Sequence, residues 1–172
     1  MNFDISGYTN YAWWSFERGF IVELEYKKAE MNDVQMLIDI YNSAFYDDYL
    51  KYGECPAYGH TKESMEKNLE TFPKIIAFFQ NSAVGVVSYQ NKGNGEYYIG
   101  CLGVKKEHQG QGIGTLLMKK FMAECSDWKM LTLVTPIDKA ENIRFYTERF
   151  GFKIIGEEKD SSVVVYQFQL NR

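Results

Sequence analysis

Lys105–Phe121 has the sequence KKEHQGQGIGTLLMKKF, in which three glycines at alternate positions stand directly before an amphipathic run. Glycine adopts positive φ at little cost and allows a ligand to approach the backbone closely. Glycines that precede a helix also expose its unpaired N–H groups, where the positive end of the helix dipole lies. Phosphate groups bind at sites of this kind. The stretch therefore predicts a loop that holds a pyrophosphate group.

The spacing of these glycines excludes two common phosphate-binding motifs. The Walker A motif requires G-x-x-x-x-G-K-[ST], which does not occur in the chain. The dinucleotide fingerprint requires G-x-G-x-x-G, but its third glycine would fall on Thr115 if the motif began at Gly110 and on Leu117 if it began at Gly112. A glycine-rich turn that binds no ligand is the alternative on this stretch alone.

The spacing that does match is Gln109-x-x-Gly112-x-Gly114. It resembles the Q/R-x-x-G-x-G/A motif of the GNAT N-acetyltransferase superfamily, whose loop holds the pyrophosphate of acetyl-CoA. In that family the motif follows the fourth strand and precedes the third helix. The segment EYYIGCLGV, residues 96–104, stands in the place of that strand.

A second resemblance to the same family lies about thirty residues further on. ENIRFYTERFGFKIIGE, residues 141–157, is similar to the family's second signature, a helix that ends F/L-Y-x-x-x-G-F. Phe145-Tyr146 and then Gly151-Phe152 correspond to it. Two signatures at the expected separation are more specific than either alone.

Periodicity and turn residues predict a single domain of mixed α/β (α+β) type. The strands are expected at 20–26, 74–80, 83–90, 96–104, 128–135, 152–157 and 163–170. Four helices are expected. The first begins at an Asn32 cap with Gln35 three residues on, and a loop follows at 46–60. The others run from Thr61 to Pro73, from the glycine stretch to about Ser126 and over 139–150. The resemblance implies the GNAT-like arrangement, a mixed, mostly antiparallel central sheet flanked by helices.

The resemblance covers about residues 20–170 and leaves residues 1–19 outside. We expect those residues to form an aromatic-rich N-terminal arm packed on the domain, and residues 20–172 to form the N-acetyltransferase domain. The alternatives for the arm are a surface for a partner or substrate and a remnant of cloning.

The resemblance implies that acetyl-CoA is the cosubstrate and that an amine accepts the acetyl group. The loop would bind the pyrophosphate, and the backbone at the strand end would pair with the pantetheine arm and polarise the thioester carbonyl. Many members carry an Asn seven residues before the helix Tyr; that position is Lys139, so Lys139 and Asn142 are alternative contacts. The expected cofactor-binding residues are Leu102, Gly103, Val104, Gln109, Gly110, Gln111, Gly112, Ile113, Gly114, Thr115, Asn142 and Tyr146.

Tyr146 is the expected general acid, because a phenol with a pKa of ~10 can protonate the departing thiolate. A tyrosine that only lines the cofactor channel is the alternative. Glu96, acting through water, is the expected general base, and His60 is a rival because of its intrinsic pKa. The absence of any single base is a further possibility. Direct transfer needs no covalent enzyme intermediate, so the lack of a Ser/His/Asp or Cys/His arrangement is no objection.

Composition narrows the remaining classes of function. The 172 residues carry a net charge of −4, which argues against a nucleic-acid binder and fits a cationic substrate as well as a solvated acidic surface. Three cysteines without a C-x-x-C pair and two histidines predict no disulfide framework and no metal site. No apolar run predicts a membrane span and the N-terminus does not resemble a signal peptide, so we expect a cytoplasmic protein. We expect it to be a monomer or a homodimer.

Two hypotheses about function follow. The first is transfer of an acetyl group to a primary amine of a small molecule or a protein through a ternary complex. The alternative is a catalytically inactive CoA-binding or sensory module on the same fold.

Overall fold

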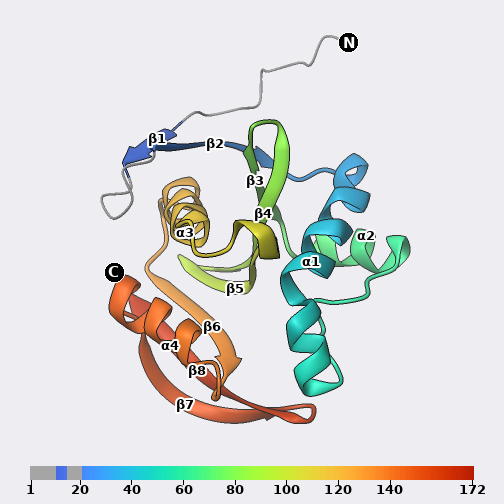
Figure 1. The fold of residues 1–172 in the computed structure, drawn as a ribbon. Helices are drawn as coiled ribbons and strands as arrows, with labels where there is room; N and C mark the ends of the chain where they lie inside the picture. The colour runs from blue at the N-terminus through green and yellow to red at the C-terminus, as the bar shows by residue number, and fades with distance from the viewer. Residues whose placement is uncertain (1–10, 15–20) are drawn as a thin grey trace. The chain divides into compact units, whose positions relative to one another are not determined.

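The computed structural model describes residues 11–14 and 21–172 (Figure 1). The predicted arm, residues 1–19, lies outside the described residues except for β1 (Tyr11–Trp14), which pairs antiparallel with β2 (Ile21–Lys28). The chain divides into two compact units: Met1–Ser88 with Cys101–Glu124, and Tyr89–Gly100 with Cys125–Arg172.

The sheet of the first unit is antiparallel. β2 pairs with β3 (Lys74–Phe79), and β3 pairs with β4 (Ser82–Gly93). The β3–β4 turn has Gln80 and Asn81 at φ values of 48° and 63°, the geometry of a two-residue hairpin turn. This places the turn one residue earlier than the predicted Asn81-Ser82 connection.

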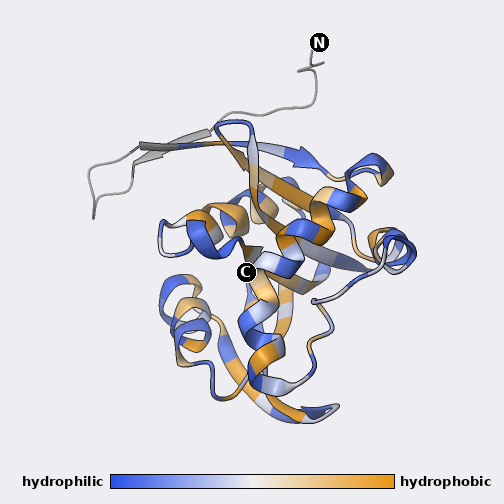
Figure 2. Ribbon diagram, turned by 45° about the vertical axis from the view of Figure 1, so that its right-hand side comes forward, coloured by the Kyte–Doolittle hydropathy of each residue, from blue (hydrophilic) through white to orange (hydrophobic). Residues whose placement is uncertain are grey.

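Helices cover both faces of this sheet. α1 (Val34–Tyr52) and α2 (Lys62–Thr71) pack against Ile76, Phe78 and Val86 in one hydrophobic core. α3 (Ile113–Glu124) lies on the other side, where its Leu117 faces β4 at Gly85 (Figure 1). Figure 2 shows hydrophobic residues concentrated in the strands and alternating with hydrophilic ones along the helices, as burial of one helix face requires.

The start and the end of α1 differ from the prediction. The expected Asn32 cap is wrong: a 3-10 turn, Met31–Asp33, precedes the helix, and the Glu30 N–H donates to the Asp33 carboxylate over 2.8 Å. The loop predicted at 46–60 is helical as far as Tyr52, because the chain has no helix-breaking residue before Gly53, which closes the helix at φ 74°. α2 begins as predicted, with the Thr61 hydroxyl accepting from the Ser64 N–H.

The second unit is built on the C-terminal strands. β5 (Glu96–Val104) pairs in parallel with β6 (Met130–Pro136) at its start, and β6 pairs antiparallel with β8 (Val163–Asn171). β8 in turn pairs antiparallel with β7 (Lys153–Asp160). Within the described residues, eight strands are hydrogen-bonded in the order β1-β2-β3-β4-β5-β6-β8-β7. The predicted mixed, mostly antiparallel sheet is thus confirmed.

The last helix changes its hydrogen-bonding pattern. α4 (Ala140–Arg144) continues into a π-helical turn over Phe145–Arg149, and Gly151 ends it at φ 78°. Four residues separate Tyr146 from Gly151, whereas the family signature has three. The match to the second signature is therefore inexact by one residue, and a π-helical turn is the form in which a helix absorbs such an insertion.

Candidate functional site

The glycine-rich loop joins the end of β5 to the start of α3. A 3-10 turn, Lys106–His108, follows the strand, and Gly110 and Gly112 then take φ values of 74° and 84°. A Cβ at either glycine would meet nothing within 4 Å, so both are required for their backbone conformation and the space beside them is open. The space beside both glycines is therefore open, and the pyrophosphate site at the start of α3 stays a prediction.

Side chains of the loop fix its shape. The Gln109 amide donates to the Val104 carbonyl over 3.0 Å, so the first residue of the motif ties the loop to the end of β5. The Gln111 amide donates to the Glu107 carbonyl over 3.4 Å. Ile113, the first residue of α3, is 1% exposed and anchors the helix start in the core.

The end of β5, where backbone contacts to the pantetheine arm are expected, packs against α1. In the second unit, the register of β5 with β6 ends at Tyr98–Thr132, although β6 continues to pair with β8 as far as Pro136. In the first unit, Gly103 faces α1, and a Cβ there would lie 2.9 Å from the Phe45 ring. The Leu102 and Val104 side chains are half-buried. The strand end is thus packed closely against α1.

Helix α1 also contacts the segment before the loop. The Lys106 N–H donates to the Ser43 hydroxyl over 3.1 Å, and that hydroxyl donates to Glu107 over 3.4 Å. The Lys106 ammonium pairs with Asp47 at 2.8 Å. The same helix therefore touches both the strand end and the approach to the pyrophosphate loop.

A buried polar cluster lies beneath α1 and α2, and the sequence did not reveal it. Lys74 is 1% exposed, and its ammonium donates to the Asn68 side chain over 2.6 Å and to the Phe72 carbonyl over 2.9 Å. Burial lowers the pKa of Lys74 to about 8. Burial likewise raises the pKa of the Cys101 thiol to about 12. The only signal in the sequence was a lysine at the start of an apolar strand.

His60, the rival base, belongs to the same cluster. Its ring packs edge-on against Tyr41, with centroids 5.7 Å apart, and its Nδ1 lies 3.0 Å from the Ser64 hydroxyl. Burial, with a smaller contribution from the Lys74 charge, lowers the pKa of His60. The imidazole is thus kept neutral at physiological pH, which is the form that accepts a proton.

Tyr146, Asn142 and Lys139 belong to the second unit. Tyr146 is 8% exposed and its ring packs against Phe152 and Phe168, with centroids 5.7 Å and 5.8 Å away. The Asn142 amide donates to the Thr135 hydroxyl on β6 over 3.2 Å. Lys139 is the N-cap of α4 rather than part of a helix face shared with the other two. The approach of these residues to the glycine loop stays a prediction.

Glu96 begins β5 and is exposed, with Tyr98 half-buried two residues on. Burial, followed by Asp160 and Glu158, raises the pKa of Tyr98. Tyr97 points to the opposite face and donates a 2.7 Å hydrogen bond to Asp127, which raises its pKa together with burial. No structural observation distinguishes Glu96 as a base, so its assignment also stays a prediction.

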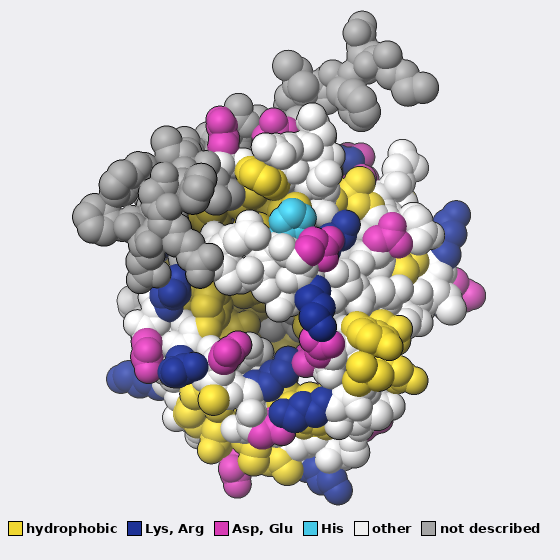
Figure 3. Space-filling view, viewed as in Figure 1, with side chains coloured by type: hydrophobic (Ala, Val, Ile, Leu, Met, Phe, Trp, Pro, Cys, Tyr) yellow, Lys and Arg dark blue, Asp and Glu magenta, His cyan; other side chains and the backbone are white. Residues whose placement is uncertain are grey.

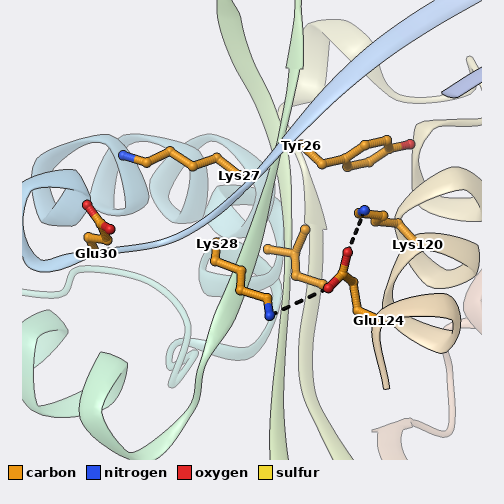
Figure 4. Close-up of a pocket in the computed structure, with 7 residues that line it drawn as sticks. Tyr26, Lys27, Lys28, Glu30, Lys120 and Glu124 are labelled. Atoms are coloured by element: carbon orange, nitrogen blue, oxygen red, sulfur yellow. Dashed lines mark ion pairs between the residues drawn. The ribbon is translucent and has the colours of Figure 1, made fainter. Parts of the chain in front are cut away.

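A pocket of about 300 Å³ lies elsewhere in the first unit and contains none of the predicted site residues. Figure 4 shows the Lys120 and Lys28 ammonium groups converging on Glu124, at 2.6 Å and 3.5 Å. These pairs compensate the charge on Glu124, and the three side chains together keep one positive charge. The residues that line the pocket are Tyr26, Lys27, Lys28, Glu30, Ile75, Lys120 and Glu124.

Comparison with known proteins identifies the class. A model of the acetyltransferase (GNAT) family matches residues 34–152, which is more than half of the chain. The chain therefore belongs to the GNAT acetyltransferase family, as the two sequence signatures predicted. A comparison with curated proteins finds no match.

Solved structures share the fold at low sequence identity. Ard1 from Thermoplasma volcanium is 19% identical with a TM-score of 0.69, over 86% of this chain and 97% of that one. The ribosomal-protein-S18-alanine N-acetyltransferase from Escherichia coli is 16% identical with a TM-score of 0.71, over 86% and 93%. PaiA N-acetyltransferase from Thermoplasma acidophilum, solved with coenzyme A, is 19% identical with a TM-score of 0.67, over 84% and 97%. These likenesses show the fold alone.

Two features are absent from the residues that the structure describes. No group of three or more His, Cys, Asp or Glu side chains there is arranged to hold a metal ion. Among the helices formed by those residues, none is long and apolar enough to cross a membrane.

Proposed function

We propose that this protein transfers the acetyl group of acetyl-CoA directly to a primary amine within a ternary complex. The open glycine loop at the start of α3, directly after the end of β5, carries the proposal. In this arrangement the N–H groups around Gly112 bind the pyrophosphate. The backbone of Leu102–Val104 pairs with the pantetheine arm and donates to the thioester carbonyl.

The chemistry balances without a covalent enzyme intermediate. The neutral amine attacks the thioester carbon, the C–N bond forms, the C–S bond breaks, and the amine gives up one proton. Tyr146 protonates the thiolate as it leaves. The proton from the amine passes to Glu96 through water, or to the neutral imidazole of His60. The packing of the Tyr146 ring against Phe152 and Phe168 supports its role, because it holds the phenol in one orientation.

The proposal is tested by binding and turnover together. We expect CoA to raise the melting temperature of the protein more than a nucleoside triphosphate does, and free thiol to be released from acetyl-CoA only when an amine acceptor is added. Binding of CoA without thiol release from any primary amine would identify an inactive CoA-binding module instead. Equal stabilisation by CoA and by nucleotides would contradict both the acetyltransferase and the inactive CoA-binding module.

A further inference from the structure

Three tyrosine rings meet on the surface at the C-terminal half of α1. The rings of Tyr49 and Tyr58 stack with centroids 4.6 Å apart and an angle of 19° between their planes. Tyr46 lies 5.8 Å from Tyr58 at 47°. Tyr46 and Tyr49 remain 45% and 41% exposed. Figure 3 shows hydrophobic side chains gathered on this face, over the end of α1. We call Tyr46, Tyr49 and Tyr58 the tyrosine cluster.

Hydrogen bonds to α1 and within the following loop hold the cluster in place. Spacings of four and seven residues put Asn42, Tyr46 and Tyr49 on one face of α1. The Asn42 side chain accepts a 3.0 Å hydrogen bond from the Gly59 N–H, and the Tyr58 N–H donates to the Cys55 carbonyl over 2.9 Å. The loop that carries Tyr58 is therefore docked on the same helix face, and the three rings form a preorganised surface.

The tyrosine cluster begins beside the expected reaction centre. Phe45, which directly precedes Tyr46, lies against Gly103 on the strand end proposed to polarise the thioester. Tyr49 follows Phe45 by four residues, a rise of about 6 Å along the helix. The cluster and the contact with the strand end therefore lie about one turn apart on the same helix.

Exposed aromatic faces attract organic cations. The helix itself provides an example, since the Lys51 ammonium lies 5.1 Å from the centroid of the Tyr52 ring. The segment that carries the cluster contains Asp47, Asp48 and Glu54 against one lysine, Lys51, although Asp47 is paired with Lys106, and the whole chain has a net charge of −4. Aromatic faces in an acidic segment favour a positively charged ligand over a neutral one.

We propose that the tyrosine cluster binds the non-reacting positive charge of the acceptor, and that the acceptor is a small amine with a second ammonium group. The assignment rests on the proposed acetyl transfer, since it names the class of amine that the same site takes. The second ammonium lies on the rings of Tyr49 and Tyr46, and the neutral primary amine at the other end attacks the thioester.

The turnover experiment compares a four-carbon linear diamine with the amino alcohol of the same length, at saturating acetyl-CoA. We expect kcat/KM to be higher for the diamine, and Tyr49→Leu to lower it roughly 3- to 30-fold for the diamine only. Tyr49→Phe retains the aromatic face and should retain the preference. Leu50→Ala removes a neighbouring side chain that is 61% exposed but has no aromatic face, and it should leave the preference unchanged.

A binding experiment keeps the inference separate from the proposed function. Tetramethylammonium should bind the wild-type protein, with its methyl resonances shifted upfield by the tyrosine rings, and Tyr49→Leu should abolish the shift. Binding of this cation without acetyl transfer to any amine would refute the proposed function and leave the cation site standing. The inference is overturned if the shift is absent, if both acceptors react equally in wild type, or if Leu50→Ala and Tyr49→Leu cause the same loss.

Discussion

Gly103 on β5 and Phe45 on α1 are in such close contact that no side chain fits between them: a Cβ at Gly103 would lie 2.9 Å from the Phe45 ring and 3.2 Å from the Ala44 Cβ. The glycine is thus needed for close packing. The contact fixes the distance between the helix that bears the tyrosine cluster and the strand end proposed to hold the thioester.

Gly103→Ala should destabilise the protein by about 1–3 kcal/mol, because overpacking forces the helix and strand apart. Acetyl-CoA turnover should fall with it. Phe45→Leu should partly rescue the alanine variant by making room for the new methyl group. Urea unfolding of both single variants and the double variant measures the coupling; free energies that add within about 0.5 kcal/mol would refute the contact as the cause.

Gly112→Glu should weaken CoA binding at least about tenfold more than Gly112→Gln, because only the glutamate adds a negative charge where the pyrophosphate is expected. Both variants strain the backbone equally, since Gly112 has a φ of 84° and any other residue there costs about 1–3 kcal/mol. Calorimetric titration with CoA measures the difference. Equal affinities in the two variants would contradict a pyrophosphate site at this loop.

The lowered pKa of Lys74 should make the stability of the protein depend on pH. Its pKa is about 8 in the folded protein and 10.5 as its ordinary value, so between these values the unfolded chain binds more protons than the folded one. The contribution of Lys74 to the free energy of unfolding therefore rises with pH across that window, by roughly 3 kcal/mol at most. Below pH 8 Lys74 is protonated in both the folded and the unfolded protein, so burial of its charge lowers the free energy of unfolding by the full amount.

Lys74→Met isolates this contribution. The difference in unfolding free energy between wild type and Lys74→Met should shift in favour of wild type as pH rises above 8. The raised pKa values of Cys101 and Tyr41 act in the opposite direction. Because the Lys74 charge itself lowers the pKa of Cys101, the comparison is made with Cys101→Ala in both proteins. A difference that stays constant from pH 7 to 10 would show that Lys74 remains protonated in the folded core.

The fold was predictable where the signal is local. The Thr61 cap, the strand at 96–104 and the helix end before Gly151 each depend on a few neighbouring residues, and each is confirmed. The length of α1 was not predictable in this way. Gly53, Pro56 and Gly59 indicate a loop over 46–60, but the helix continues as far as Tyr52, just before the first of these residues. Tertiary packing extends a helix beyond what local periodicity indicates.

In the candidate site, too, only residues with a local signal could be predicted from the sequence. Gly112 could be recognised because its positive φ is a property of glycine itself. Lys74 could not, because its burial depends on α2, whose Asn68 side chain and Phe72 carbonyl accept from the ammonium. The π-helical turn at Tyr146 could not be predicted either, because one added residue before Gly151 leaves the hydrophobic pattern almost unchanged.

The choice of general base can be made by comparing two variants. If Glu96 accepts the proton through water, Glu96→Gln should lower kcat roughly 10²- to 10⁴-fold while His60→Gln has little effect. If His60 is the base, the reverse holds, and the acidic limb of the pH–rate profile should lie below the ordinary histidine pKa, because burial lowers the pKa of His60. Full activity in both variants would leave water as the acceptor.

Tyr146→Phe tests the general acid. The substitution keeps the aromatic packing against Phe152 and Phe168 and removes only the hydroxyl. We expect kcat to fall on the order of 10²- to 10⁴-fold with the Michaelis constant for acetyl-CoA little changed, the pattern of an interaction made only in the transition state. Tyr166→Phe removes a hydroxyl from β8 in the same unit and should leave both constants unchanged. A higher Michaelis constant for acetyl-CoA with unchanged kcat in Tyr146→Phe would show that Tyr146 only lines the cofactor channel.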